Sequence, residues 1–267
     1  MSTKIVVIGA LGKMGREISS AVLADPDCAL SGCVEHPANA GIGKDYALCT
    51  GFNAPGVVVR SSPLDLQLSD STIIDFSSPK ASLSLLDSLA GKSTRLVLGT
   101  TGFTDVETEI VRKASNSIPI VLSPNMSLGV NLLFVLTELA AARLGESFDI
   151  EIVEAHHRFK KDSPSGTARK LGEIAASALG LAYDDAVKNG RAGMVGERPR
   201  KEIGMHAVRG GDIVGDHTVL FAGIGERLEL RHVAHSRATF ARGAVVAAKW
   251  LSSQKPGLYS IRDVLGL

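Results

Sequence analysis

The chain has 267 residues, of which 45% are hydrophobic and 21% are charged, an ordinary globular composition that can fill one large core or two modest ones. Its 29 basic and 28 acidic side chains leave a formal net charge of +1. Partners that are nucleic acids or acidic membranes usually require a larger basic excess, so we expect neither kind of partner.

The first residues and the cysteines indicate a reduced cytoplasmic protein. MSTKIVVIGALG passes from a short polar start into an apolar run, without the charged and long apolar regions of a secretory signal. We expect no apolar stretch to reach the roughly 18 residues that span a bilayer. Cys28, Cys33 and Cys49 are odd in number and form no CxxC pair, so we predict neither a disulfide framework nor a metal site.

A short β-branched run, Lys4 to Ile8, predicts a strand that is buried on both faces. It leads into Gly9-Ala10-Leu11-Gly12-Lys13-Met14-Gly15, a variant of the dinucleotide fingerprint, and Arg16 to Ala24 then has a helical pattern. Side chains at the first two glycines would hold a pyrophosphate away from the backbone, while the third glycine allows the helix to pack closely. The pattern predicts a dinucleotide site; the alternative is a plain tight turn between strand and helix.

An acidic residue stands where a dinucleotide site needs one. Ala29 to Val34 predicts a second strand, and Glu35 follows it about 20 residues after the last glycine of the fingerprint. A carboxylate at this place accepts hydrogen bonds from the hydroxyl groups of the adenosine ribose. We therefore expect Glu35 to hold that ribose.

Strands and helices continue to alternate downstream. The predicted strands are Thr72 to Phe76, Arg95 to Leu98 and Ile118 to Leu122, and the predicted helices are Lys80 to Leu89 and Asp105 to Ser115. The last two strands end in Gly99-Thr100-Thr101-Gly102 and Ser123-Pro124-Asn125-Met126. Ligands of an open parallel sheet bind beyond the carboxyl ends of its strands, so both loops are candidates to contact the nicotinamide ribose. Either loop alone could also be a plain connection.

The pattern changes in the second half, which indicates a second domain. Leu128 to Leu144 predicts a long helix, Asp149 to Glu154 alternates like a half-exposed strand, and Pro164 to Ala168 opens a helix that reaches to about Leu179. Later alternating runs are typical of antiparallel strands: Ile203 to Arg209, His217 to Ala222 and Arg227 to Ala234. Helices cover one face of such a sheet, which leaves the other face for solvent or another subunit.

The segment Glu151 to Ala168, EIVEAHHRFKKDSPSGTA, concentrates groups that suit acid–base chemistry on an anion. His156, His157, Arg158 and Lys160 form a cationic cluster that leads into Ser165-Gly166-Thr167 at a predicted helix N-terminus, which itself favours anions. Histidine exchanges protons near neutral pH, and lysine, hydroxyl groups and backbone N–H groups suit a carboxylate substrate. The alternative is a solvated cationic surface.

This segment, read with GALGKMG, GTTGF and SPNMSLGVN, resembles the 4-hydroxy-tetrahydrodipicolinate reductase (dihydrodipicolinate reductase) family. The resemblance extends through RGGDIVGDHTV, GERLEL, SRATFARGA and DVLGL. It implies an α/β fold with a Rossmann-like dinucleotide-binding domain, residues 1–127 and 237–267, and an α+β domain, residues 128–236, whose mixed sheet forms a homotetramer. The helix predicted over Phe240 to Leu251 would then return to the cofactor domain.

The resemblance also implies a reaction and its residues. Family members use NADH or NADPH to reduce a cyclic dicarboxylate imine in the diaminopimelate route to lysine. His156 would be the catalytic acid–base and Lys160 the proton donor, while the substrate carboxylates would be held by His157, Ser165, Gly166 and Thr167. The cofactor would be lined by Gly9, Ala10, Leu11, Gly12, Lys13, Met14, Glu35, Gly99, Thr100, Thr101, Ser123, Pro124, Asn125 and Met126.

One position departs from the family pattern. Many members have arginine after the acidic residue, where it can hold a 2′-phosphate, whereas this chain has Glu35-His36. We therefore expect NADH to serve at least as well as NADPH. Two other functions are weighed against the reductase: a semialdehyde dehydrogenase, which needs a cysteine in the catalytic half, and a non-catalytic NAD(H)-sensing regulator, which needs no His–Lys cluster.

Overall fold

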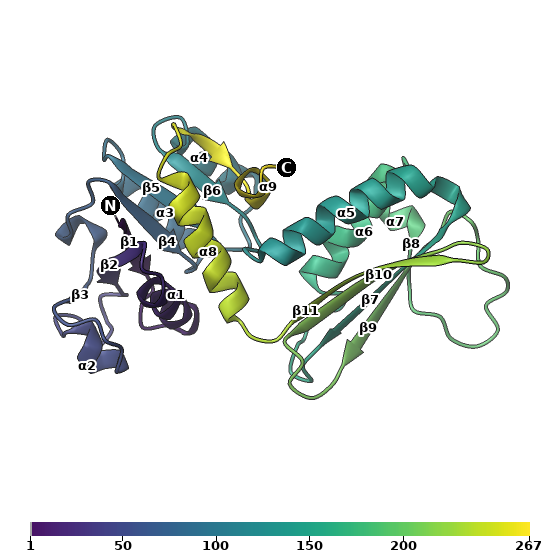
Figure 1. Cartoon of the computed structure of the whole chain (residues 1–267), viewed down its shortest axis with the longest axis horizontal. Coiled ribbons are helices and arrows are strands. Elements are labelled where there is room, and N and C mark those ends of the chain that lie inside the picture. The colour runs from purple at the N-terminus through teal and green to yellow at the C-terminus, as the bar shows by residue number, and fades with distance from the viewer. Residues whose placement is uncertain (1) are drawn as a thin grey trace. The chain divides into compact units, whose positions relative to one another are not determined.

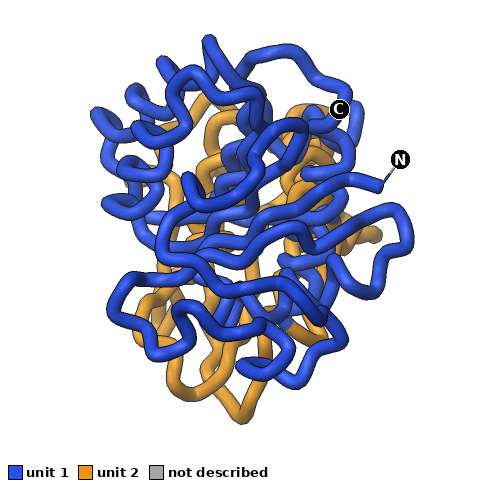
Figure 2. Tube along the Cα trace, turned by 90° about the vertical axis from the view of Figure 1, so that its left-hand side faces the viewer, with its two compact units in different colours: residues 1–128, 237–267 blue, residues 129–236 orange. Residues whose placement is uncertain are grey.

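Two separate sheets organise the chain in this computed structural model, which describes residues 2–267. One compact unit consists of Met1–Leu128 with Arg237–Leu267, and the other consists of Gly129–Ser236 (Figure 2). Each unit has its own sheet and its own hydrophobic core, so each is described by itself.

The sheet of the first unit has seven strands, all paired in parallel, in the order β12-β6-β5-β4-β1-β2-β3 (Figure 1). The strand order reverses beside β1, because β2 and β3 extend to one side of it and β4, β5 and β6 to the other. Such a reversal is where open parallel sheets bind ligands. The strands are β1 (Thr3–Ile8), β2 (Cys28–Val34), β3 (Val59–Arg60), β4 (Ser71–Asp75), β5 (Thr94–Leu98), β6 (Pro119–Leu122) and β12 (Gly257–Tyr259).

Helices cover both faces of this sheet. Successive residues of β1 point to opposite faces, so Ile5 packs in the core beneath α1 and α8, whereas Val6 packs in the core beneath α3 and α4. Burial on both faces explains why the strands are continuous apolar runs. The helices are α1 (Lys13–Ala24), α2 (Tyr46–Thr50), α3 (Pro79–Ser88), α4 (Asp105–Ala114), α8 (Ala238–Leu251) and α9 (Ile261–Leu265), with the 3-10 turn η1 (Pro63–Asp65).

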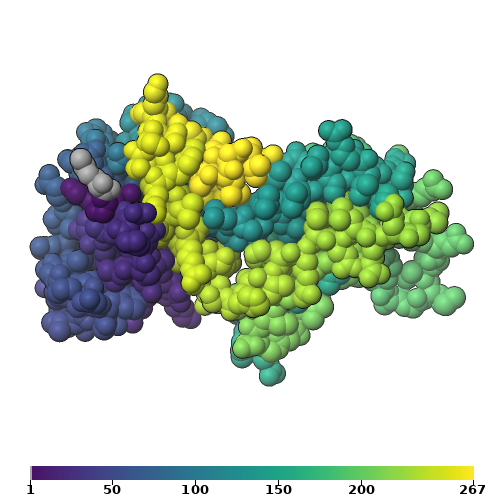
Figure 3. All heavy atoms as spheres, in the orientation of Figure 1, coloured from purple at the N-terminus to yellow at the C-terminus, as the bar shows by residue number. Residues whose placement is uncertain are grey.

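The helix α8 joins the first unit although it follows the whole of the second unit in sequence. It lies beside α1, as Figures 1 and 3 show, and its Ala244 and Ala248 belong to the same core cluster as Ile18. Lys249 adds ion pairs to Asp25 and Asp27, with N–O distances of 3.0 and 2.9 Å. Residues at both ends of the chain therefore complete one core.

The sheet of the second unit is mixed, in the order β11-β10-β7-β9-β8. β10 pairs antiparallel with β7 and β11, whereas β9 pairs parallel with β7 and β8. The prediction that Ile203 to Arg209 is an antiparallel strand was therefore wrong, because alternation reports which residues share a face and not the direction of the neighbour. The strands are β7 (Asp149–His156), β8 (Val187–Asn189), β9 (Ile203–Arg209), β10 (Gly215–Ala222) and β11 (Arg227–Ala234).

Helices cover only one face of this second sheet within the described residues (Figure 1). Ile150, Ile152 and Phe221 point from the sheet into a core that includes Leu133 of α5 and Leu171 of α6. The helices are α5 (Leu128–Leu144), α6 (Gly166–Ala178) and α7 (Tyr183–Ala186), with the 3-10 turn η2 (Gly145–Ser147).

The helix α5 corrects one expectation. The helical segment Leu128–Ser147 has 20 residues and a mean hydropathy of 1.5, which is enough by length and composition to cross a membrane, although no such stretch was expected. Leu133 and Ala141 on this helix are buried in the core of the second unit. Packing on the sheet thus accounts for part of its apolar character, as in the core helices of other folds.

The face of the second sheet opposite the helices carries an ionic network around Glu151. This carboxylate accepts hydrogen bonds from Arg191 at 2.8 and 3.0 Å, from Arg198 at 2.8 Å and lies 2.7 Å from Nε2 of His206. Burial alone would raise the pKa of Glu151, but these three partners lower it to about 2. The network ties the irregular segment 190–202, between β8 and β9, to the central strand β7.

Candidate active site

The glycine turn after β1 leaves a helix end open for an anion. Gly9 has a φ of +65°, and a Cβ on Gly15 would collide with the Gly9 carbonyl oxygen, so both positions require glycine. The N-cap of α1 is Gly12, which provides no side-chain hydrogen bond to the first turn. The first-turn N–H groups at Lys13 and Met14 have no partner within the helix, so this end fits a phosphate.

Two residues of the predicted glycine turn, Ala10 and Leu11, use their backbone groups in hydrogen bonds within the protein. The N–H group of Ala10 donates to the Val34 carbonyl at 3.1 Å, and its carbonyl accepts a hydrogen bond from the Tyr46 hydroxyl at 2.9 Å. The N–H group of Leu11 donates to a carboxylate oxygen of Glu35 at 3.0 Å. Ala10 and Leu11 therefore shape the turn, which leaves the phosphate to the residues after them.

Glu35 lies against the glycine turn, as the position of a ribose-binding acid requires. Its carboxylate accepts hydrogen bonds from the N–H groups of Leu11 and His36, at 3.0 and 2.9 Å. The Nδ1 atom of His36 accepts a hydrogen bond from the Ala38 N–H group at 3.2 Å. In this arrangement Nδ1 is a hydrogen-bond acceptor and cannot also donate a hydrogen bond.

A cavity of about 300 Å³ lies at the carboxyl edge of the first sheet and brings together three predicted segments. Because the carboxyl ends of parallel strands meet at one edge, the turn after β1 and the loops after β5 and β6 all reach it. Its lining consists of Met14, Phe76, Ser77, Gly99, Thr100, Thr101, Pro124, Asn125, Met126 and Phe240. This cavity has the composition and place of a nicotinamide site.

Sequence reasoning missed Phe76, Ser77 and Phe240 as lining residues of this cavity. Phe76 and Ser77 stand at the end of a predicted strand, and that place was the signal that could have found them. A Cβ on Gly99 would collide with the Phe76 ring, so the two residues shape this edge together. Phe240 comes from α8, far along the chain, and no local pattern indicated it.

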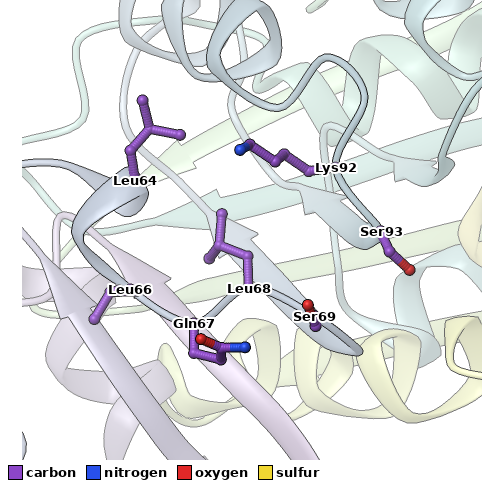
Figure 4. Close-up of a pocket in the computed structure, with 7 residues that line it drawn as sticks. All are labelled: Leu64, Leu66, Gln67, Leu68, Ser69, Lys92 and Ser93. Carbon is purple, nitrogen blue, oxygen red and sulfur yellow. The ribbon is translucent and has the colours of Figure 1, made fainter.

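A second cavity in the first unit lies at the opposite edge of the sheet (Figure 4). It has about 190 Å³ and is formed by segments that precede β4 and β5: Leu64, Leu66, Gln67, Leu68, Ser69, Lys92 and Ser93. It contains none of the predicted site residues. Its place at the amino ends of the strands argues against a role in cofactor binding.

In the second unit, the acid–base residue predicted at His156 is the last residue of β7. The strand extends two residues beyond the predicted end at Glu154, because pairing with β9 continues as far as Arg209. Glu154 and His156 alternate onto the helix-covered face, and Nδ1 of His156 lies 2.6 Å from a carboxylate oxygen of Glu154. Nδ1 of His156 therefore carries a hydrogen that it donates to Glu154, and Nε2 remains free to exchange a proton with a ligand.

Glu154 is fully buried and is held by Arg209. The guanidinium donates one hydrogen bond to each carboxylate oxygen, both at 2.8 Å. Burial alone would raise the pKa of Glu154, but the hydrogen bonds from Arg209 and His156 outweigh it and hold the pKa below its ordinary value of 4.5. A charged Glu154 fixes the orientation of the His156 ring.

Lys160 lies on the turn that follows β7. Its backbone N–H group donates to the His157 carbonyl at 3.1 Å, and its ammonium lies 2.8 Å from a carboxylate oxygen of Asp162. That hydrogen bond lowers the pKa of Asp162. Nδ1 of His157 is buried without a hydrogen-bond partner among the described residues.

The N-terminus of α6 is hydrogen-bonded directly to Glu154. Ser165 caps the helix by accepting a hydrogen bond from the Ala168 N–H group at 3.2 Å, and its own N–H group donates to Glu154 at 3.0 Å. Gly166 is the first residue of the helix and Thr167 the second. The first turn of α6 thus faces the same region as Glu154 and His156, and its dipole favours an anion.

Glu154, Arg209 and His217 are functional candidates that sequence reasoning left without a role. His217 is 4% exposed, and its Nε2 atom lies 3.1 Å from the Ser165 hydroxyl oxygen. Strand alternation placed Glu154 on the face of His156 and could have identified it. The other two residues reach the site through strand register, since Arg209 pairs with His156 and His217 pairs with Glu154.

Two protein-family models match the chain, one in each half. The model described as the dihydrodipicolinate reductase N-terminus matches residues 3–126, and the model of the C-terminus matches residues 129–265. Together they cover the glycine turn, the cavity loops before residue 127 and the whole segment around His156.

Relatives resemble the chain along nearly its full length. The 4-hydroxy-tetrahydrodipicolinate reductase of Geotalea uraniireducens (strain Rf4) is 47% identical over 264 residues, 99% of both chains. The enzyme of the same name from Anaeromyxobacter dehalogenans (strain 2CP-1 / ATCC BAA-258) is 48% identical over 265 residues, 99% of this chain and 98% of the relative. A dipicolinate-bound dihydrodipicolinate reductase from Paenisporosarcina sp. TG-14 shares the fold, with a TM-score of 0.75 at 24% identity over 97% of this chain and 98% of the other.

Proposed function

The chain belongs to the dihydrodipicolinate reductase family, and from that premise we propose that His156 and Lys160 are its acid–base residues. The activity is the NAD(P)H-dependent reduction of 4-hydroxy-tetrahydrodipicolinate to tetrahydrodipicolinate, in the diaminopimelate route to lysine. One hydride and one proton are consumed, and one water is released. The observation that best supports the acid–base assignment is the contact between Glu154 and His156 beside the helix end that carries Ser165.

The first unit has the features needed to hold the dinucleotide. We assign the pyrophosphate to the open N-terminus of α1, the adenosine ribose to Glu35, and the nicotinamide to the cavity beyond β5 and β6. NAD(P)H, when bound, supplies the hydride. The chain's contribution at this step is to hold the ring and to keep Phe76 and Gly99 packed beside it.

Residues of the second unit handle the proton. Hydride addition to a conjugated ring leaves negative charge on that ring, which a positioned cation stabilises and a nearby acid neutralises. We assign the proton delivery to the Lys160 ammonium and to Nε2 of His156, whose other nitrogen is held by Glu154. The substrate carboxylates are assigned to His157 and to Ser165, Gly166 and Thr167 at the start of α6.

The direct test is NADH oxidation in the presence of substrate that a synthase generates in the same mixture. The reductase oxidises NADH only when the substrate forms, whereas a non-catalytic NAD(H)-sensing regulator binds NADH without oxidising it. The dehydrogenase alternative also lacks its nucleophile. All three cysteines lie in the first unit, and burial raises the pKa of Cys33 to about 12 and of Cys28 to about 11.

NADH is expected to serve at least as well as NADPH. A 2′-phosphate would lie beside the Glu35 carboxylate, which repels it, and beside a His36 ring whose Nδ1 atom accepts the Ala38 hydrogen bond and so does not donate to the phosphate. Steady-state kinetics with each cofactor at saturating substrate give the two specificity constants. His36→Arg is the matched variant and should move the preference toward NADPH; a hundredfold preference for NADPH in the unmodified protein would contradict the prediction.

We also propose that the protein is a cytoplasmic homotetramer that assembles through the second sheet. The helix-free face of that sheet presents apolar side chains such as Val153, Val208 and Leu220 beside the ionic network of Glu151. A half-exposed apolar sheet face is a surface that subunits bury against each other. The free cysteines are compatible with a reducing compartment.

A further inference from the structure

His217 lies on β10, beside the central strand β7 of the second sheet, and has no role in the reaction proposed above. It stands opposite Glu154 in the register of β10 with β7, and its ring meets the His156 ring edge-on at a centroid distance of 5.2 Å. Its two nitrogens differ sharply. Nε2 lies 3.1 Å from the Ser165 hydroxyl oxygen, whereas Nδ1 is buried with no hydrogen-bond partner among the described residues.

The surroundings of His217 keep its ring neutral. Burial, with a smaller effect of the neighbouring His156, lowers the pKa of His217 to about 4, while Glu154 acts in the opposite direction. His232 and Lys160 also face the ring and oppose its protonation. At neutral pH the imidazole therefore carries a single N–H group, on one of its two nitrogens.

The environment selects the nitrogen that carries this hydrogen. A buried N–H group without an acceptor costs the full desolvation of a donor, whereas a proton on Nε2 has the Ser165 oxygen as its acceptor. The favoured tautomer therefore places the hydrogen on Nε2 and leaves a lone pair on Nδ1. In this tautomer His217 donates to Ser165.

The direction of that bond determines where the Ser165 hydroxyl hydrogen points. A hydroxyl group has two lone pairs and one hydrogen. One lone pair accepts from the Ala168 N–H group at 3.2 Å and the other accepts from Nε2 of His217. The hydroxyl hydrogen is left for a third group, and no acceptor for it occurs among the residues that the structure describes.

We propose that His217 is a positioning residue that orients the Ser165 hydroxyl as a hydrogen-bond donor to a carboxylate of the substrate. The proposal rests on the function proposed above, in which Ser165 binds that carboxylate. His217 does not contact the substrate itself. Its N–H group occupies the lone pair that would otherwise allow the hydroxyl to rotate away.

Two amide substitutions make a matched pair for the test. In His217→Gln the amide nitrogen can reach the place of Nε2, whereas in His217→Asn it reaches only the place of Nδ1, and both variants bury one amide. We expect His217→Asn to raise the KM for substrate and the inhibition constant of dipicolinate about tenfold, the size of one hydrogen bond to a charged group, with kcat changed much less. His217→Gln should restore most of the loss.

The same measurements in a Ser165→Ala background separate positioning from general damage. If His217 acts through Ser165, His217→Asn adds no further increase in KM once the hydroxyl is gone. A full additional increase in that background, or a Gln variant as impaired as the Asn variant, would overturn the proposal.

The tautomer can be observed directly in the unmodified protein. Nitrogen NMR of protein labelled with ¹⁵N-histidine, with the His217→Gln variant to identify the signal among seven histidines, should show the hydrogen on Nε2. A hydrogen on Nδ1 refutes the proposal whatever kinetic constants the variants have. If instead the tautomer is confirmed but the unmodified protein neither binds dipicolinate nor oxidises NADH, the proposed function of the site has failed.

Discussion

Replacing Lys160 with alanine is expected to lower the turnover number at least tenfold while NADH binding survives, and replacing His156 with alanine is expected to do the same. Positioned acids contribute about a hundredfold or more to such reactions, and both side chains belong to the second unit rather than to the glycine turn. Steady-state turnover at saturating substrate and fluorescence titration with NADH measure the two effects separately.

Lys161→Ala provides the matched control for Lys160, because it removes an exposed lysine next in sequence. Its turnover should match that of the unmodified protein. His156→Asn refines the histidine test, because the amide can still donate to Glu154 but has no nitrogen that titrates near neutral pH. If the Lys160 and His156 variants kept their turnover but lost NADH binding, the acid–base role of these two residues would be contradicted.

Replacing Arg209 with methionine is expected to destabilise the protein by about 3 kcal/mol or more, because it leaves the fully buried Glu154 carboxylate without its cation. Urea unfolding at fixed protein concentration measures the difference. Arg231→Met is the control, because the Arg231 side chain is largely exposed and its distance to Asp216 is long, at 3.3 Å. This substitution should cost no more than about 1 kcal/mol of stability.

The pH dependence of the Arg209 variant follows from the lowered pKa of Glu154. A carboxyl group whose pKa is lower in the folded state stabilises that state above its unfolded pKa, and the stabilisation is lost as the pH falls through the folded value. The difference between the two proteins should therefore be complete at pH 7 and shrink below the ordinary value of 4.5. A difference that is constant from pH 7 to pH 3 would show that Arg209 acts through packing alone.

The sequence predicted the strong elements of the fold because those elements carry their own signals. α5 begins and ends where its apolar pattern does, and the buried strands β4 and β5 contain short runs of Ile, Leu and Val. The strands that went unpredicted have two or three residues and lie at sheet edges: β3, β8 and β12. An edge strand this short is defined by its neighbour, which a local pattern does not contain.

In the candidate site too, the sequence predicted the residues that belong to local motifs and missed those that depend on contacts between distant strands. The fingerprint, the loops after two strands and the segment around His156 were all visible as local motifs. Arg209 and His217 were not, because each reaches the site through the register of distant strands. Arg209 stands opposite His156, 53 residues away in sequence, and His217 stands opposite Glu154, 63 residues away. Neither alternation nor spacing encodes which residues of two distant strands lie opposite each other.

The return of α8 to the first unit has a consequence for how the protein is made. Ala244 and Ala248 complete a core whose other members, such as Ile5 and Ile18, leave the ribosome more than 200 residues earlier. During synthesis the part of this face that α8 covers therefore stays exposed until α8 is made, whereas the second unit, which is contiguous in sequence, can already fold. A ribosome that stops before residue 238 releases a chain that still displays this face, which is the kind of surface that chaperones bind.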